Sequence, residues 1–423
     1  MFKAILSLFK AKDLRKKILI VTGLLLVTRF FAAVPVPGAD TERLKAFFLQ
    51  NQYLGLVNIF SGGALANFSV AMLGIGPYIT ASIIFQLLTM IFPSLKEMYY
   101  EQGEAGRAKF VRYTRFLTVV LAFIQGFAFL SYLKNQGVIL ELSGFELFRN
   151  LSLITAGSVI FMWLGELISE QKIGNGSSLI IFAGIVTDLP NAIRTNIITF
   201  DYSQIPSYLI FLVLGLVTIG SVVLINEAER RVPISYAKRV RGMKVYGGAN
   251  TYLPLKINQA GVIPIIFAIS ILLFPGLLAQ ILSLSKNETL LKLALNLQSF
   301  FNNQLIYGFS YFILVFAFTY FYTLITFDPN EISKNLQHQG GFIPGIRPGQ
   351  NTAEFLGRIL YRITFLGAIF LGIIAILPLA VQSMTGISTL TLGGTSLLIV
   401  VSVALETVRQ LRAQLLMREY EAF

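Results

Sequence analysis

The side chains that carry most enzyme chemistry are scarce in this sequence. His338 is the one histidine and there is no cysteine, which excludes a multi-histidine metal site, a disulfide and thiol catalysis. No Walker A pattern is present, so ATP binding through a P-loop is excluded as well. We find no nucleophile accompanied by a base and an orienting group. The residues therefore predict no catalytic site, no metal and no cofactor, and any transport must draw nucleotide energy from a partner.

Ionisable residues lie almost entirely outside the long apolar stretches. Arg29 lies within one, but near its end, where a long side chain can reach water. Glu166, Asp188 and Glu406 lie near the ends of others. Ion-coupled transporters usually keep an ionisable group near the membrane midplane. The pattern therefore argues against a secondary transporter for a small solute, which is the main alternative for a membrane protein of this size.

The apolar stretches define the architecture. Hydrophobic residues make up 55% of the 423 residues and charged residues 13%, whereas a soluble protein has about 25% charged residues. The stretches are long enough to cross a hydrocarbon core of about 30 Å. They predict an all-α polytopic membrane protein with ten transmembrane helices. The predicted spans are residues 18–34, 77–92, 116–133, 153–169, 177–189, 208–226, 260–282, 306–326, 363–381 and 390–405.

Positive charge is concentrated on one side of these spans. The side that holds both termini carries 26 of the 34 Lys and Arg residues, and the other side carries 7, with Arg29 inside the first span. Basic loops stay in the cytoplasm, so both termini are predicted to be cytoplasmic. The net charge of +13 is therefore mainly a signal of topology. Nucleic-acid binding by the basic face, through a ribosome, is a weaker alternative.

Four segments outside the spans have a distinct character. Residues 1–17 are basic, and their apolar residues share one helical face, which indicates either an interfacial helix or a partly ordered tail. Residues 54–74 are moderately apolar and broken by paired glycines, so they suit a site inside protein at membrane depth or an ordinary external loop. The basic loops 227–256 and 327–357 are longer than a connection requires, which favours a binding role.

Several short strings, in order along nearly the whole chain, are similar to those of the SecY family, the channel-forming subunits of protein translocases. They are PYITASIIFQLL (77–88), GEAGR (103–107), YTR (113–115), GNG (174–176), IIFAGIV (180–186), YAKR (236–239), LPLKIN (253–258), GVIP (261–264), PGIRPG (344–349) and GGTSLLIVV (393–401). The resemblance implies two inverted five-helix halves, residues 18–205 and 206–405, around a central pore. A cytoplasmic tail, 406–423, follows them and is shorter than in some members.

The resemblance also assigns roles within the pore. Residues 54–74 correspond to a plug that closes the pore from outside, with Ile59, Phe60, Ser61, Gly62, Gly63, Ala64, Leu65, Ala66 and Asn67 at its centre. An apolar pore ring corresponds to Ile79, Ile83, Ile181, Ile185, Ile266 and Ile399. By composition alone, isoleucines like these are more often ordinary core or lipid-facing residues.

The second and seventh spans correspond to the two sides of a lateral gate. Gln86 and Asn258 lie on these spans, where they would hydrogen-bond across the closed gate or serve as ordinary contacts between helices. The basic loops correspond to sites that bind a motor or a ribosome. The residues concerned are Arg230, Arg231, Lys238, Arg239, Arg241, Lys244 and Arg347. Without the resemblance, Arg347 would be read as a solvated loop arginine.

The implied function is a passive, non-enzymatic protein-conducting channel in the bacterial cytoplasmic membrane. Such a channel translocates unfolded preproteins and inserts membrane proteins. The implied partners are small membrane subunits resembling SecE and SecG, the motor ATPase SecA, the ribosome, signal sequences and nascent chains, and membrane lipids.

Overall fold

The computed structural model describes residues 12–37, 44, 61, 63–65, 67–135, 137–139, 143–198, 202, 205–236, 239–241, 244–246, 250–283, 287–385 and 388–421. Each predicted span overlaps a helix. These helices are α2 (Lys12–Ala33), α5 (Gly76–Ile91), α7 (Gly103–Asn135), α8 (Gly144–Glu170), α9 (Gly176–Ile198), α10 (Ile205–Glu227), α11 (Ile263–Ser283), α13 (Gln304–Thr326), α15 (Gln350–Thr385) and α16 (Ser388–Glu421). The amphipathic segment 1–17 lies mostly outside the described residues.

Fewer helices than the ten expected are by themselves long and apolar enough to cross a membrane. Among the described residues, α7, α8, α10, α13 and α15 are long and apolar enough. A sixth span results if α5 is counted together with α6 (Pro93–Tyr100), which follows it after a bend of 112°. The apolar parts of α9 and α11, Gly176–Pro190 and Ile263–Leu272, are shorter.

Two further helices lie between predicted spans. The amphipathic helix α12 (Glu288–Asn302) follows α11, and Asn287 caps its first turn by accepting a hydrogen bond from the Thr289 amide. The helix α14 (Pro329–His338) follows α13, and Asp328 caps it in the same way. Side-chain oxygens at such positions satisfy amides that have no partner within the helix.

A small sheet corrects the prediction of an all-α fold. Strand β1 (Glu229–Tyr236) pairs antiparallel with β4 (Asn250–Lys256) and with β5 (Gly341–Phe342), so β1 is the central strand. A second hairpin joins β2 (Arg239–Arg241) and β3 (Lys244–Tyr246). Val232 and Ile234 are buried while their neighbours are not, which is the alternation of a strand with one covered face.

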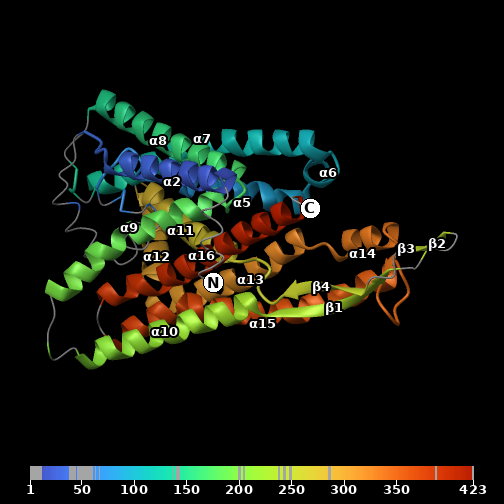
Figure 1. Ribbon diagram of the computed structural model, residues 1–423. Helices are drawn as coiled ribbons and strands as arrows, with labels where there is room; N and C mark the ends of the chain where they lie inside the picture. Colours follow the sequence, from blue (N-terminus) through green and yellow to red (C-terminus); the bar gives the residue numbers. More distant parts are fainter. Residues whose placement is uncertain are drawn as a thin grey trace.

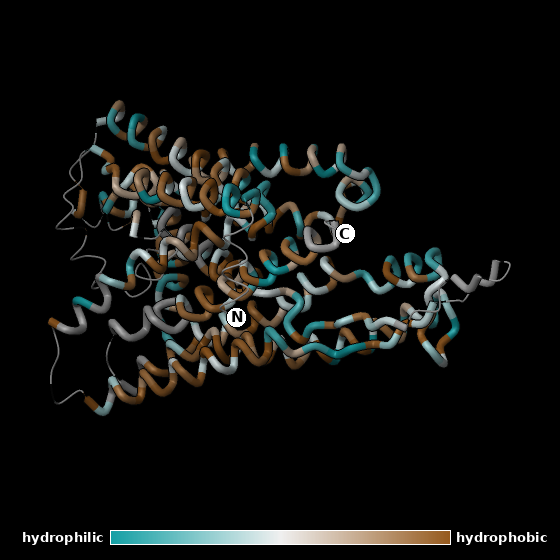
Figure 2. Tube along the Cα trace, viewed as in Figure 1, coloured by the Kyte–Doolittle hydropathy of each residue, from teal (hydrophilic) through white to brown (hydrophobic). Residues whose placement is uncertain are grey.

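The helices lie side by side as a bundle, and the strands project from one end of it together with α6 and α14 (Figure 1). We call this end the sheet end. Figure 2 shows that the projecting parts are largely hydrophilic, whereas the bundle is dominated by hydrophobic residues. This separation of polar and apolar parts is the one expected for a bundle that spans a membrane and exposes a polar domain on one side.

Close contacts between backbones hold the first half of the bundle together. A Cβ at Gly157 of α8 would lie 2.0 Å from the Val70 carbonyl oxygen, and one at Gly176 would lie 1.8 Å from that of Gly165. Only glycine fits at these two positions. The segment before α5 therefore packs directly on α8, and α8 and α9 meet at a tight turn. Small residues allow this kind of approach between membrane helices.

Candidate pore and docking surface

Six isoleucines that were predicted to form a ring all belong to the main buried cluster of the bundle, together with 27 other buried residues; we call this cluster the isoleucine cluster. The six come from four helices: Ile79 and Ile83 from α5, Ile181 and Ile185 from α9, Ile266 from α11 and Ile399 from α16. None of them is more than 7% exposed. On α5 and on α9 the two residues are four positions apart, so each helix presents both to the same side. The cluster thus joins helices from both halves of the chain.

The predicted plug segment is described in part. Ile59, Phe60, Gly62 and Ala66 lie outside the described residues. Ser61, Ala64 and Leu65 are buried, whereas Asn67 is exposed. Ala64 belongs to the isoleucine cluster, and Leu65 packs in a second cluster that includes residues of α7 and α8. This segment therefore lies against the cluster rather than forming a detached loop.

Hydrogen bonds fix the C-terminal part of the plug segment. The Ser61 hydroxyl accepts from the Leu65 amide over 3.0 Å. The Phe68 carbonyl accepts from Val36, and the Val34 carbonyl accepts from Val70, over 2.8 and 2.9 Å. Because Val34 and Val36 directly follow α2, the end of α2 and the end of the plug segment are paired. Phe68 has a φ of 46°, a backbone conformation that is strained for a residue with a side chain.

A pocket lies next to the isoleucine cluster, between α5, the start of α9, α11 and α13. Its volume is about 120 Å³. Ile79 and Ile266 of the cluster form part of its wall. Polar side chains make up much of the rest. They are Tyr78, Ser82, Gln86, Asn175, Ser177, Ser178 and Tyr322. The arrangement places a cavity with many polar side chains directly beside isoleucines of the buried cluster.

The expected hydrogen bond between Gln86 and Asn258 is not formed. Gln86 Nε2 instead donates to Ser82 Oγ, one turn earlier on α5, over 3.1 Å. Asn258 lies before α11 rather than on it, and its side chain closes a turn with Gly261 through bonds of 3.0 and 3.2 Å. The Asn258 amide nitrogen also donates to Asn226. The Asn258 side chain therefore makes its hydrogen bonds with the end of α10 and with the turn before α11.

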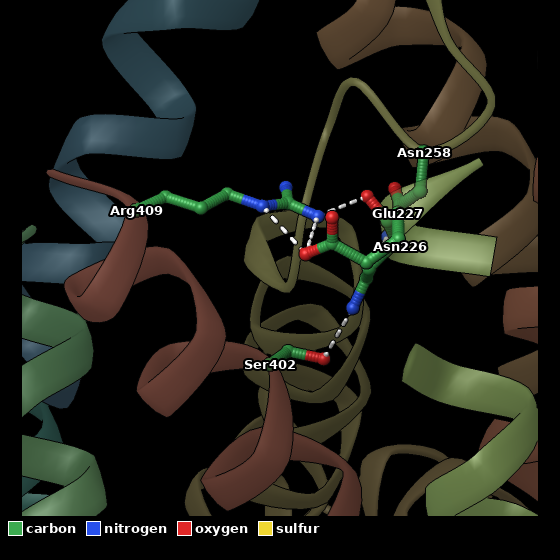
Figure 3. Close-up of polar contacts among 5 residues, drawn as sticks. All are labelled: Asn226, Glu227, Asn258, Ser402 and Arg409. Carbon is green, nitrogen blue, oxygen red and sulfur yellow. Dashed lines mark hydrogen bonds and ion pairs between the residues drawn. The ribbon is translucent and has the colours of Figure 1, made fainter. Parts of the chain in front are cut away.

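Asn258 belongs to a polar network that the sequence reasoning missed. Asn258 Nδ2 donates to Asn226 Oδ1 over 2.8 Å, and Asn226 Nδ2 donates to Ser402 Oγ of α16 over 3.2 Å. Arg409, also on α16, donates to the Glu227 carboxylate over 2.8 and 3.1 Å and to the Asn226 carbonyl. Figure 3 shows how these side chains converge. They join the end of α10, the approach to α11 and α16.

The network lies where β1 and β4 join the helix bundle. The Ile257 amide donates to the Ala228 carbonyl over 3.0 Å, which closes β1 and β4 where they meet the bundle. Lys256, the last residue of β4, lies near Arg409 and the carboxylates of Glu227, Glu229 and Glu406. Burial lowers the pKa of Lys256 below its ordinary value, and Arg409 adds to the effect. The sequence does contain a signal for this network, namely polar residues such as Asn226 and Ser402 near the ends of the predicted spans.

The two predicted docking loops form one structure. β5, from loop 327–357, pairs with Ser235 and Tyr236 of β1, from loop 227–256. Ile343 packs with Val232 and Leu255 in a third buried cluster beneath this sheet. Arg230 and Arg231 are exposed on β1, and Arg231 forms an ion pair of 2.8 Å with Glu229. Arg239, Arg241 and Lys244 belong to the β2–β3 hairpin, and Lys238 lies outside the described residues.

Arg347 is exposed on a turn that its surroundings hold firmly. The Ile346 amide donates to the Ile343 carbonyl over 3.0 Å, and the Thr352 hydroxyl donates to the Arg347 carbonyl over 3.0 Å. The Ser333 hydroxyl of α14 donates to the Gly349 carbonyl over 2.6 Å. Gly345 and Gly349 have φ values of 83° and 97°, which glycine adopts without strain. The backbone beneath the guanidinium is therefore fixed while the side chain is free to meet a partner.

Comparisons with known proteins identify the relatives of this chain. The family model described as SecY matches residues 69–408. A chain named "Protein translocase subunit SecY" from Thermotoga maritima is 42% identical over 436 residues, covering 100% of this chain and 98% of that one. Chains of the same name from Streptomyces coelicolor and Mycobacterium tuberculosis are 42% and 40% identical, each over 100% of this chain.

Solved structures share the fold at lower sequence identity. "The structure of a protein conducting channel" superposes with a TM-score of 0.63 at 19% identity and covers 93% of this chain and 91% of that one. "Sec61 in the Canine ribosome-channel complex from the endoplasmic reticulum" superposes with a TM-score of 0.60 at 18% identity over the same shares of the two chains.

Proposed function

This chain belongs to the SecY family of protein translocase subunits, and we propose that it forms a passive pore for unfolded polypeptide, closed by a plug and able to open sideways. The observation that carries this proposal is that six isoleucines of α5, α9, α11 and α16 are buried within one core cluster. The plug segment lies on the cluster, and a polar pocket lies beside it. This order of parts suits a channel that must block ions at rest and admit a chain when driven.

The chemistry of the ring explains both tasks. Isoleucine side chains offer water and ions no hydrogen bonds, so a tight apolar ring resists the passage of ions. The same side chains are flexible and present no fixed charge, so they fit around a passing polypeptide of any sequence. Plug and ring would act in series, the plug from the end opposite the sheet. The pore itself would perform no catalysis.

The orientation of the chain follows from its charges. The sheet end carries the basic loops, and the positive-inside rule places such loops in the cytoplasm. We propose a bacterial cytoplasmic membrane as the location, with both termini cytoplasmic and ten spans arranged as two five-helix halves. The short apolar helices α9 and α11 are counted as spans because they line the ring at the centre of the bundle.

The lateral gate in this proposal runs between α5 and α11. Both helices line the pocket, through Gln86 and Ser82 on one side and Ile263 and Phe267 on the other. Separation of the two helices would open the pocket toward lipid. A signal sequence or a membrane segment would leave the pore by this route. The network around Asn226 would hold the sheet end of α11 while the gate is closed.

The sheet and the Arg347 turn would dock cytosolic partners. Arg230, Arg231 and Arg347 are exposed there, and a guanidinium forms bidentate bonds with carboxylates or phosphates. A SecA-like motor ATPase and a ribosome are the proposed partners, and the canine Sec61 structure is by its title a ribosome–channel complex. Small subunits resembling SecE and SecG would complete the channel in the membrane.

Reconstitution tests the proposal. The channel, purified with its small membrane subunits, is placed in proteoliposomes with a radiolabelled unfolded preprotein. Protected preprotein should accumulate only when a SecA-like motor and ATP are both present. Uptake of a small solute driven by an ion gradient alone, with no protected preprotein under any condition, would show a secondary transporter instead.

A further inference from the structure

The carboxylate of Asp188 lies directly against the backbone of the plug segment. A Cβ built on Gly63 would lie 2.9 Å from Asp188 Oδ1, 3.3 Å from Oδ2 and 3.5 Å from Cγ. Gly63 also has a φ of 80°, which disfavours any residue with a side chain. The absence of a side chain at residue 63 is therefore what lets the carboxylate approach. This contact joins α9 to the plug on the side away from the sheet end.

A positive charge accompanies this carboxylate. Arg29, near the end of α2, interacts electrostatically with Asp188, and the helices α2 and α9 pack against each other. Both side chains are half-buried in the wall of the bundle. Charged groups within a membrane protein are unfavourable unless they are paired or perform a task. The pore, ring and gate described above use neither residue.

The rest of the plug is held by apolar contacts. Ala64 packs in the isoleucine cluster, and Leu65 and Phe68 pack in the second cluster. These contacts are non-directional and favour burial of the segment without fixing its position. The contact at Gly63 is different because it involves one polar group, the Asp188 carboxylate of α9, which also interacts electrostatically with Arg29. It supplies a fixed point against which the plug rests.

We infer that Arg29 and Asp188 form a charged seat for the plug, in which Arg29 fixes the Asp188 carboxylate and the carboxylate supports the backbone at Gly63. Both are positioning residues, and the inference rests on the plug assignment in the proposed function. With the pair intact, the closed position of the plug is favoured. Removal of either charge abolishes the attraction between these two side chains, so the remaining one no longer supports the seat.

A disulfide tests the contact itself. The chain has no cysteine, so Gly63→Cys and Asp188→Cys introduce a single possible pair. In idle channels under oxidising conditions the two residues should form a disulfide, because a side chain at 63 points at the side chain of 188. The disulfide should not form when a translocating chain is stalled in the pore before the oxidant is added. Its absence in idle, correctly assembled channels would overturn the inference.

Ion conductance of idle channels in planar bilayers tests the role of the charges. Asp188→Asn should raise the conductance about fivefold, at the lower end of typical couplings between two sites. Arg29→Gln should raise it similarly, and the double variant should conduct no more than either single variant, because the two residues act as one unit. Glu288→Gln, an exposed carboxylate on α12 at the same end, is the matched control and should leave the conductance unchanged.

Deletion of residues 62–67 separates the two proposals. If the deletion raises the conductance and Asp188→Asn does not, the plug assignment holds and the charged seat is rejected. If the deletion has no effect, the plug assignment fails, whereas the disulfide result still reports on the contact. If the effects of Arg29→Gln and Asp188→Asn multiply, the two residues act independently, and the inference of a joint seat is wrong.

Discussion

Asn258 donates a hydrogen bond to Asn226 over 2.8 Å, and this bond ties the segment before α11 to the last turn of α10. Both side chains are buried, at 5% and 8% exposure. Asn226 in turn donates a hydrogen bond to Ser402 of α16. The helix that carries one side of the proposed gate is therefore fixed to two neighbours at the sheet end. A partner that moves the sheet would act on this point first.

Loss of the bond should destabilise the channel. Asn258→Ala leaves the Asn226 oxygen without its donor, and an unsatisfied buried group costs about 1–3 kcal/mol. We expect a lower midpoint of thermal unfolding, together with increased export of a preprotein whose signal sequence is weakened. Asn335→Ala, at an exposed position of α14, is the matched control. An unchanged midpoint and unchanged signal selection would show that the network does not restrain the gate.

A polar residue in the proposed ring should admit water and ions. Ile399 has no exposed surface, so Ile399→Asn places an amide inside the apolar cluster. The idle channel should leak ions, and preproteins with weak signals should be exported more readily. Ile399→Val is the matched control, because it keeps the site apolar and typically costs about 0.5–1.5 kcal/mol in stability. Equal leak from the two variants would argue against Ile399 as a ring residue.

The proposed ring also predicts where a polypeptide passes. Photoreactive residues placed at positions 83, 185 and 266 should crosslink to a preprotein stalled during transport. A photoreactive residue at Leu216, which is 62% exposed on α10, should not. Crosslinks at position 216 without any at the ring would move the path out of the isoleucine cluster.

Arg347 should be needed for motor-driven transport. Arg347→Lys keeps the positive charge but loses the planar guanidinium that can donate two parallel hydrogen bonds, so it should slow ATP-dependent import into proteoliposomes. Arg347→Glu reverses the charge and should slow import more. Channel levels should not change, because the side chain makes no contact that holds the turn together. Lys334→Glu, at an exposed position of α14 nearby, is the matched control. Normal import by the Glu variant at equal channel levels would leave Arg347 without a role in coupling.

The topology can be checked because the chain lacks cysteine. In sealed right-side-out vesicles, an impermeant thiol reagent should label Asn287→Cys, at the start of α12, and spare His338→Cys, at the end of α14. Disruption of the vesicles should make both positions reactive. Labelling of position 338 in sealed vesicles would reverse the orientation and place the basic loops outside.

The sequence predicted the helices well because an apolar block of span length seldom forms anything but a membrane helix. The sheet was missed, although β1 contains the alternation of Val232 and Ile234, because a loop between two spans was read for its charge alone. Pairing with β5 could not be predicted, since the two partners lie about a hundred residues apart and no local pattern records the contact.

Side-chain partners were harder to predict than elements. Gln86 and Asn258 were expected to meet because they lie near two helices of one gate, but Asn258 is drawn into a turn with Gly261 and a bond with Asn226. Arg29 and Asp188 were both noted as ionisable residues near span ends. The approach of Asp188 to Gly63, and its interaction with Arg29, depend on how α2 and α9 pack, which hydropathy does not report.

The pairing of β1 with β5 has a consequence for how the protein is made. Tyr236 of β1 leaves the ribosome about a hundred residues before its partner Gly341, which at ordinary rates of synthesis is about 5–20 s. During that interval the edge of β1 that later pairs with β5 has no partner strand, and α13 is synthesised before β5. A channel still being synthesised therefore lacks the completed sheet, so a motor that reads this surface would distinguish finished channels from unfinished ones.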